Sequence, residues 1–131
     1  MVVGTPEYMA PEQLMGDEVD GRADIYAVGV VLWECLVGNP PIQADNVMTL
    51  ITRKLEMVPE NPAGLVPDVP AALGALVLRA MARDAAERPQ TAAEFAELLT
   101  AVAEDGEGGG RIAGQKAAAE ALTPKWNATV R

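Results

Sequence analysis

The stretch RADIYAVGVVLWECLVGNPP occupies residues 22–41 and reads as a helix that is apolar on nearly every side. Asp24 lies near its start, where a carboxylate suits the positive end of the helix dipole. Gly38 stands where a C-terminal glycine cap belongs, and Pro40 and Pro41 prevent the helix from continuing. Because a helix this apolar has to be buried on all sides, the sequence predicts that other elements surround it.

Three more helices are predicted further along the chain, from apolar residues spaced three and four apart. Asp45 is the expected N-cap of the first, and Thr91 with Glu94 forms a capping box at the start of the last. No alternating pattern is long enough to predict a sheet, so the fold class is mainly α. The expected ranges are 44–57, 71–84 and 91–104, preceded by a short helix at 11–15.

The connections between these helices are rich in glycine and proline. Residues 16–21 and 58–70 are expected to be loops, and residues 85–90 a connector. After the last helix, the glycines of residues 105–110 predict a flexible linker. The chain is therefore divided into a helical domain at 1–104, this linker, and a basic tail at 111–131 that is disordered or partly helical.

Charge and composition exclude several classes of function. The net charge is −9, with −12 on residues 1–110 (6 basic, 18 acidic) and +3 on residues 111–131 (4 basic, 1 acidic). An acidic body argues against nucleic acid as a partner. The chain has no histidine, which removes histidine-based acid–base catalysis and histidine metal ligands.

The single cysteine indicates the cellular compartment of the protein, and the apolar runs show whether a membrane span is expected. Cys35 has no partner for an internal disulfide, which fits a reducing, cytoplasmic setting, and we expect it to be a small buried hydrophobe. The longest apolar run, residues 25–37, is interrupted by Glu34 and is shorter than the roughly 20 residues of a membrane span. No membrane segment is predicted in this chain.

The motif GTPEYMAPE, at residues 4–12, resembles the P+1 loop and Ala-Pro-Glu motif of serine/threonine protein kinases, in the style of bacterial members. The later segments resemble the rest of the helical C-terminal kinase lobe in the same order. Helix F matches residues 22–42, helix G 44–55, helix H with its Arg-Pro turn 73–89, and helix I 91–99. The resemblance covers about residues 2–103 and implies a C-terminal lobe, helices F to I, without the N-terminal β lobe.

The resemblance also implies roles in positioning the substrate. Thr5 matches the threonine whose hydroxyl bonds the catalytic aspartate and lysine of the family, which marks Ser/Thr specificity. Four residues that follow it would shape the pocket for the residue after the phosphoacceptor. They are Pro6, Glu7, Tyr8 and Met9.

Four further residues are implied as structural supports of a kinase active site. Glu12 matches the glutamate that pairs with the arginine of the Arg-Pro turn, here Arg88, and such a buried pair should be bidentate. Asp24 matches the helix F aspartate that accepts backbone N–H bonds from the catalytic loop. Gly29 would allow close packing along the same helix.

Several parts that phosphoryl transfer requires have no counterpart in this sequence. These are the Gly-rich loop, the strand lysine, the catalytic loop and the Asp-Phe-Gly motif. No catalytic residue, cofactor or metal is therefore expected on this chain, and ATP and Mg are implied only for the complete kinase. The resemblance thus predicts an N-terminally truncated kinase that is inactive alone, with protein substrates as partners of a complete protein that could be membrane-anchored.

Two other interpretations stay open. The chain could be a stand-alone, pseudokinase-like protein-binding module that docks proteins through the P+1 surface and helix G. It could also be a small helical domain whose motif match is accidental. The accidental match predicts no contact between Glu12 and Arg88, so this pair distinguishes it from the kinase interpretation.

Overall fold

The computed structural model describes residues 6–108 of the 131-residue chain, and over these residues it contains helices and no strand. The predicted helical fold is therefore confirmed for this part of the chain. Thr5, the end of the expected linker and the tail at 111–131 lie outside the described residues. The elements are η1 (Pro6–Tyr8), α1 (Pro11–Leu14), α2 (Arg22–Val37), α3 (Val47–Glu56), α4 (Pro62–Leu65), α5 (Ala71–Ala80), η2 (Ala85–Glu87) and α6 (Ala92–Gly108).

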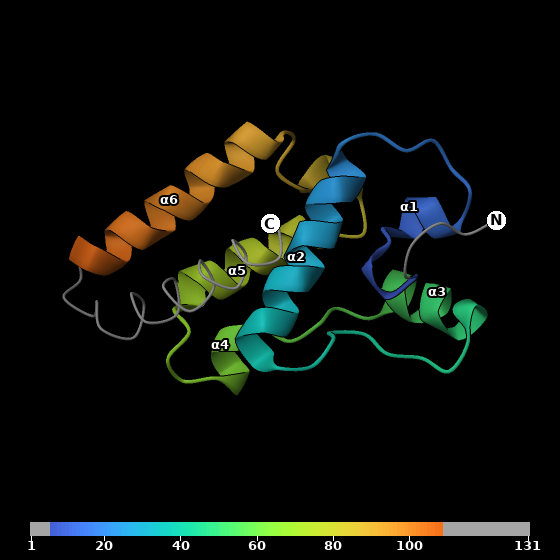
Figure 1. Ribbon diagram of the computed structural model, residues 1–131, viewed down its shortest axis with the longest axis horizontal. Coiled ribbons are helices and arrows are strands. Elements are labelled where there is room, and N and C mark those ends of the chain that lie inside the picture. The colour runs from blue at the N-terminus through green and yellow to red at the C-terminus, as the bar shows by residue number, and fades with distance from the viewer. Residues whose placement is uncertain (1–5, 109–131) are drawn as a thin grey trace, which may run out of the picture.

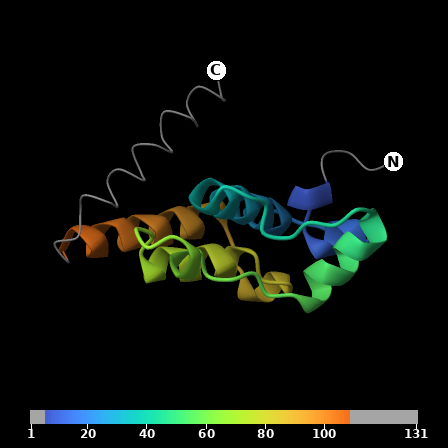
Figure 2. The ribbon, with the colours of Figure 1, turned by 90° about the horizontal axis from the view of Figure 1, so that it is seen from below.

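Helix α2 is the centre of the arrangement (Figure 1). It packs mainly on α5, and α5 also contacts α4 and α6. Helices α1 and α3 lie together to the right of α2, and η1 contacts both α2 and α3. Figure 2, turned by 90°, shows α2 and α5 as two layers. The N-terminal elements are thus held between the central helix and α3.

The core forms where α2 faces α5. Tyr26, Val30 and Trp33 of α2 are buried against Val77 and Met81. A second cluster of buried side chains joins α2 and α5 to the apolar face of α6. Its members are Ile25, Leu76, Ala80 and Phe95, with Leu98, Leu99 and Val102 packed against them.

Helix α2 ends as predicted but is not buried on all sides. Gly38 has a φ of 101°, the left-handed conformation that glycine adopts without strain, and its N–H donates to the Glu34 carbonyl at 2.7 Å. Val28, however, is 39% exposed, and Cys35 is also exposed. The two residues are seven apart and share a helix face that no element of the described part covers. The prediction of a buried Cys35 is therefore wrong.

The starts of α3 and α6 differ in detail from the predictions. The N-cap of α3 is Asn46, not Asp45, and its side chain accepts the Thr49 N–H at 2.9 Å. At α6, the Thr91 hydroxyl accepts the Glu94 N–H at 3.0 Å, as a capping box requires. The Glu94 carboxylate then accepts the N–H of Gln90, one residue before the expected partner, at 2.7 Å.

Three boundaries were also predicted wrongly. The expected loop at 58–70 contains α4, whose N-cap Asn61 accepts the Ala63 N–H at 2.9 Å. Helix α5 ends at Ala80, four residues early, before the turn that carries Arg88. Helix α6 continues to Gly108, so the expected linker begins inside the helix, because each residue added to a formed helix gains a hydrogen bond.

No helix of the part described, residues 6–108, is long and apolar enough to cross a membrane.

Candidate functional site

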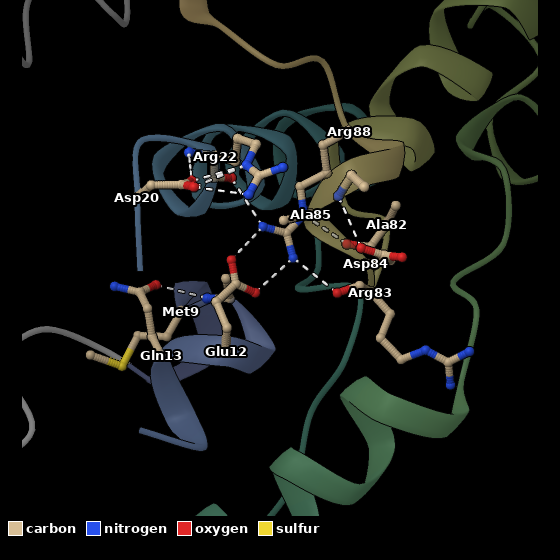
Figure 3. A network of polar contacts seen from close by, with 12 residues as sticks. Met9, Glu12, Gln13, Asp20, Arg22, Ala82, Arg83, Asp84, Ala85 and Arg88 are labelled. Atoms are coloured by element: carbon tan, nitrogen blue, oxygen red, sulfur yellow. Dashed lines mark hydrogen bonds and ion pairs between the residues drawn. The ribbon is translucent and has the colours of Figure 1, made fainter. Parts of the chain in front are cut away.

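Glu12 of α1 and Arg88, which follows η2, form a bidentate ion pair (Figure 3). The Arg88 Nη1 lies 2.7 Å from Glu12 Oε2, and Nη2 lies 2.8 Å from Oε1. Arg88 is 0% exposed, while the Glu12 side chain is partly accessible. The hydrogen bonds from Arg88 hold the pKa of the Glu12 carboxyl below its usual value. The structure therefore brings together the two residues on which the accidental-match interpretation depended.

All five N–H donors of Arg88 have acceptors. Besides the two bonds to Glu12, Nε donates to the Ala82 carbonyl at 2.7 Å, and Nη1 donates to the Arg22 carbonyl at 3.1 Å. Nη2 also donates to the Arg83 carbonyl at 3.1 Å. These bonds join α1, the start of α2 and the turn after α5, so one buried side chain fixes three segments (Figure 3).

Tyr26 supplies the apolar side of this network. Its ring lies 5.0 Å from the Arg88 Cζ and 5.1 Å from the Lys54 Nζ, within the range of a cation–π contact. Burial is the main cause that raises the pKa of Tyr26 to about 12. The same ring thus lies beside the Glu12–Arg88 pair and beside a second buried cation.

That second cation, Lys54 of α3, contacts residues 6–9. Its Nζ donates to the carbonyls of Pro6 at 3.1 Å, Glu7 at 2.8 Å and Met9 at 2.6 Å. Lys54 was not predicted from the sequence. The available signal was its position, because 54 follows 50 and 51 at the helical spacing of the side of α3 that holds the buried Leu50.

Tyr8 ties the same residues to α2. Its hydroxyl donates to Glu34 Oε1 at 2.6 Å, and this bond is the main cause that raises the pKa of Tyr8 to about 12. Nearby, Oε2 of Glu7 is buried and has no hydrogen-bond partner among the described residues. Residues 6–9 are therefore anchored from two helices, α2 and α3.

Gly29 and Asp24 lie at different places along α2. A Cβ added at Gly29 would lie 2.9 Å from the Met81 Cγ and 3.0 Å from the Ala80 Cβ, so glycine permits the close approach of α2 and α5. Asp24 is exposed near the start of α2. Its predicted role depends on a catalytic loop that the described residues do not contain.

The described residues do not fit the chemistry of a nucleotide–metal site. Among the side chains that the structure describes, residues 6–104, no three of His, Cys, Asp or Glu are grouped so that they could hold a metal ion. A hollow of about 520 Å³ between α3 and α5 is lined by Lys54, Arg83, Asp84 and Glu87 among others, with no Gly-rich loop to bind phosphates.

Comparison with known proteins identifies the family. The protein kinase domain family matches residues 1–100. The kinase PknD of Mycobacterium tuberculosis is 48% identical over 95 residues, which are 72% of this chain and 14% of that protein. The kinase pkn3 of Myxococcus xanthus is 41% identical over 103 residues, or 77% of this chain and 19% of that protein. A probable PknB of Bifidobacterium longum is 39% identical over 100 residues, or 76% and 14%.

The chain thus spans less than a fifth of the length of these curated relatives. The family match, residues 1–100, includes both Glu12 and Arg88 and the helices that pack on α2. Both the order of the motifs and the extent of the match lead to one conclusion: the chain belongs to the protein kinase family, and its relatives here are bacterial serine/threonine kinases.

Proposed function

We propose that this chain is the substrate-docking part of an ATP-dependent serine/threonine protein kinase. In this proposal residues 6–9, here termed the docking segment, shape the pocket for the residue that follows the phosphoacceptor. Thr5 positions the substrate hydroxyl, and α3 offers a second surface for the protein substrate. The structural supports of the docking segment, in this proposal, are Glu12, Arg88, Asp24 and Gly29.

The observation that carries the proposal is the anchoring of the docking segment. Its carbonyls accept hydrogen bonds from Lys54, and its Tyr8 donates to Glu34. A surface that recognises a peptide loses less conformational entropy on binding when its backbone is already fixed.

We further propose that the chain does not transfer phosphate by itself. Positioning of ATP and stabilisation of the transferred phosphoryl group supply almost all of the catalysis in kinases. In the complete kinase, ATP and Mg²⁺ would be held by segments outside the part of the kinase that this chain spans. The complete protein would act on proteins at a cytoplasmic site, with or without a membrane anchor.

A second candidate is a stand-alone protein-binding module. It is favoured by the two core clusters, which bury side chains from α2, α5 and α6 within this chain alone. Such a module would bind protein substrates and compete with an intact kinase for them. The exposed face of α2 around Val28 argues in the opposite direction, because a stand-alone domain rarely leaves its central helix uncovered.

The test uses the purified 131-residue chain and a library of peptides that have a central threonine and randomised flanks. Binding is measured by fluorescence anisotropy, and phosphopeptide is measured by mass spectrometry after Mg²⁺ and ATP are added. We expect binding without phosphopeptide. Phosphopeptide formation would overturn the proposed inactivity, and the absence of binding would overturn the docking role. Inhibition of an intact kinase on the same library would favour the stand-alone module.

A further inference from the structure

The Lys54 side chain is only 4% exposed, which is rare for lysine. A protonated lysine has three N–H donors and no acceptor. Its Nζ has one partner for each donor, all within four residues of the chain: the carbonyls of Pro6, Glu7 and Met9. All three N–H donors of the Lys54 ammonium group are therefore bonded to the docking segment.

The three carbonyls depend on Lys54 to different degrees. The Pro6 carbonyl also accepts the Met9 N–H, at 3.2 Å. Among the described residues, the carbonyls of Glu7 and Met9 accept from Lys54 alone. An apolar side chain at position 54 would leave these two partly buried acceptors without a donor, and a carbonyl that has lost its partner away from water is costly. The backbone would then have to turn them toward water.

We propose that Lys54 is a positioning residue for substrate docking, because it sets the backbone conformation of the docking segment from α3. The role in substrate docking rests on the proposed function, whereas the contact between Lys54 and the docking segment does not. It makes α3 and the docking segment one unit. A displacement of α3 would then be transmitted directly to the pocket that receives the substrate.

Two neighbouring side chains set the electrostatic surroundings of Lys54. The Glu7 carboxylate from η1 favours the ammonium form, and the Tyr26 ring from α2 covers it at 5.1 Å. Burial acts more strongly and lowers the pKa of Lys54 to about 8. A neutral amine has two N–H donors, so one of the three carbonyls loses its bond once the proton leaves.

The first experiment measures the contact without any peptide. Carbonyl ¹³C shifts of Pro6, Glu7 and Met9 are compared in the wild type, in Lys54→Met, and in the control Arg53→Met, which changes the adjacent exposed cation. The Trp33 indole N–H, bonded to the Glu60 carbonyl, reports on the fold. We expect carbonyl shifts in Lys54→Met only, with the indole signal unchanged. Unchanged carbonyl shifts in a folded Lys54→Met protein would overturn the proposal.

If Lys54→Met does not fold, a pH titration of the wild type decides the question. The Lys54 side-chain signals and the three carbonyl shifts should move together, with a midpoint near pH 8, while the indole signal stays constant. Carbonyl shifts that do not follow the Lys54 signals would contradict the inference.

The second experiment measures binding of the threonine-centred peptide library. We expect Lys54→Met to lose about tenfold in affinity, the effect of losing a hydrogen bond to a charged group. The control Arg79→Met, which removes an exposed cation of α5 outside the proposed docking surfaces, should bind like the wild type. Wild-type affinity should fall above pH 8, and that of Lys54→Met should not. Equal affinities of the two proteins would overturn the positioning role. If the wild type binds no peptide, the proposed function fails, while the carbonyl shifts still test the contact.

Discussion

The carboxylate of Glu12 and the guanidinium of Arg88 are 76 positions apart in the sequence and share two hydrogen bonds, of 2.7 and 2.8 Å. The pair joins the segment that follows residues 6–9 to the turn between α5 and α6. Because Arg88 is completely buried, its charge depends on Glu12 for neutralisation. The pair therefore links α1 to the turn before α6 through a buried charge.

Replacing Glu12 by glutamine should lower the free energy of unfolding by about 3 kcal/mol, because it strands the buried Arg88 charge. The value is at the lower end of the usual range because the Glu12 side chain still reaches water. Urea unfolding followed by Trp fluorescence measures it. The control Asp20→Asn alters an exposed ion pair and should change nothing measurable. Equal stability of Glu12→Gln and the wild type would show that the pair is not a structural link.

The same pair predicts a loss of stability in acid. The pKa of Glu12 is lowered in the folded chain, so its contribution is complete above its ordinary value of 4.5. That contribution disappears as the pH falls through the lower, folded value. The difference in unfolding free energy between the wild type and Glu12→Gln should be constant near neutral pH and decrease below about pH 4.5. A difference that persists unchanged in strong acid would contradict this assignment.

Tyr8 predicts a separate effect in alkali. The raised pKa, about 12 against an ordinary 10, means that its stabilising contribution is present below pH 10 and is lost as the pH rises toward 12. Tyr8→Phe removes the hydrogen bond to Glu34 and should cost about 1 kcal/mol at neutral pH. Its unfolding free energy should fall less than that of the wild type between pH 10 and 12. Parallel pH profiles of the two proteins would contradict the prediction.

Gly29→Ala should destabilise the contact between α2 and α5. Overpacking against Met81 and Ala80 costs roughly 1–3 kcal/mol, and the better helix propensity of alanine returns part of it. We expect a net loss of about 1 kcal/mol in thermal or urea unfolding. Gly64→Ala is the control, since a Cβ there meets Glu60 only at 3.7 Å or beyond. A Gly29→Ala protein more stable than the wild type would show that the two helices separate easily.

Local patterns predicted much of this fold. The glycine cap at Gly38, the threonine cap at Thr91 and the apolar face of α6 follow from the backbone and from helical spacing. Predictions failed where tertiary contacts or competing caps decide. Asp45 and Asn46 are adjacent and both are good N-caps, so residue type alone does not decide between them, and the structure uses Asn46. The exposure of Cys35 depends on which elements cover α2, which periodicity does not reveal.

The candidate site was predictable in the same uneven way. The contact between Glu12 and Arg88 could be expected from motif resemblance, although 76 residues separate them. The resemblance assigned no role to Lys54, and a lysine in a sequence is ordinarily a surface residue. Its burial follows from three carbonyls that converge only when η1 folds against α3. This convergence depends on the tertiary fold of the backbone, so the local sequence around Lys54 does not reveal it.

The most direct test of the docking claim is an amide NMR titration of the ¹⁵N-labelled chain with the threonine-centred peptide library. We expect saturable shifts at Glu7, Tyr8 and Met9 and along α3, with α6 unaffected. Lys54→Met should weaken these shifts, whereas Arg79→Met, on the exposed face of α5, should not. Shifts confined to α6 or to the exposed face of α2 would contradict the claim that the docking segment receives the substrate, as would the absence of any saturable change.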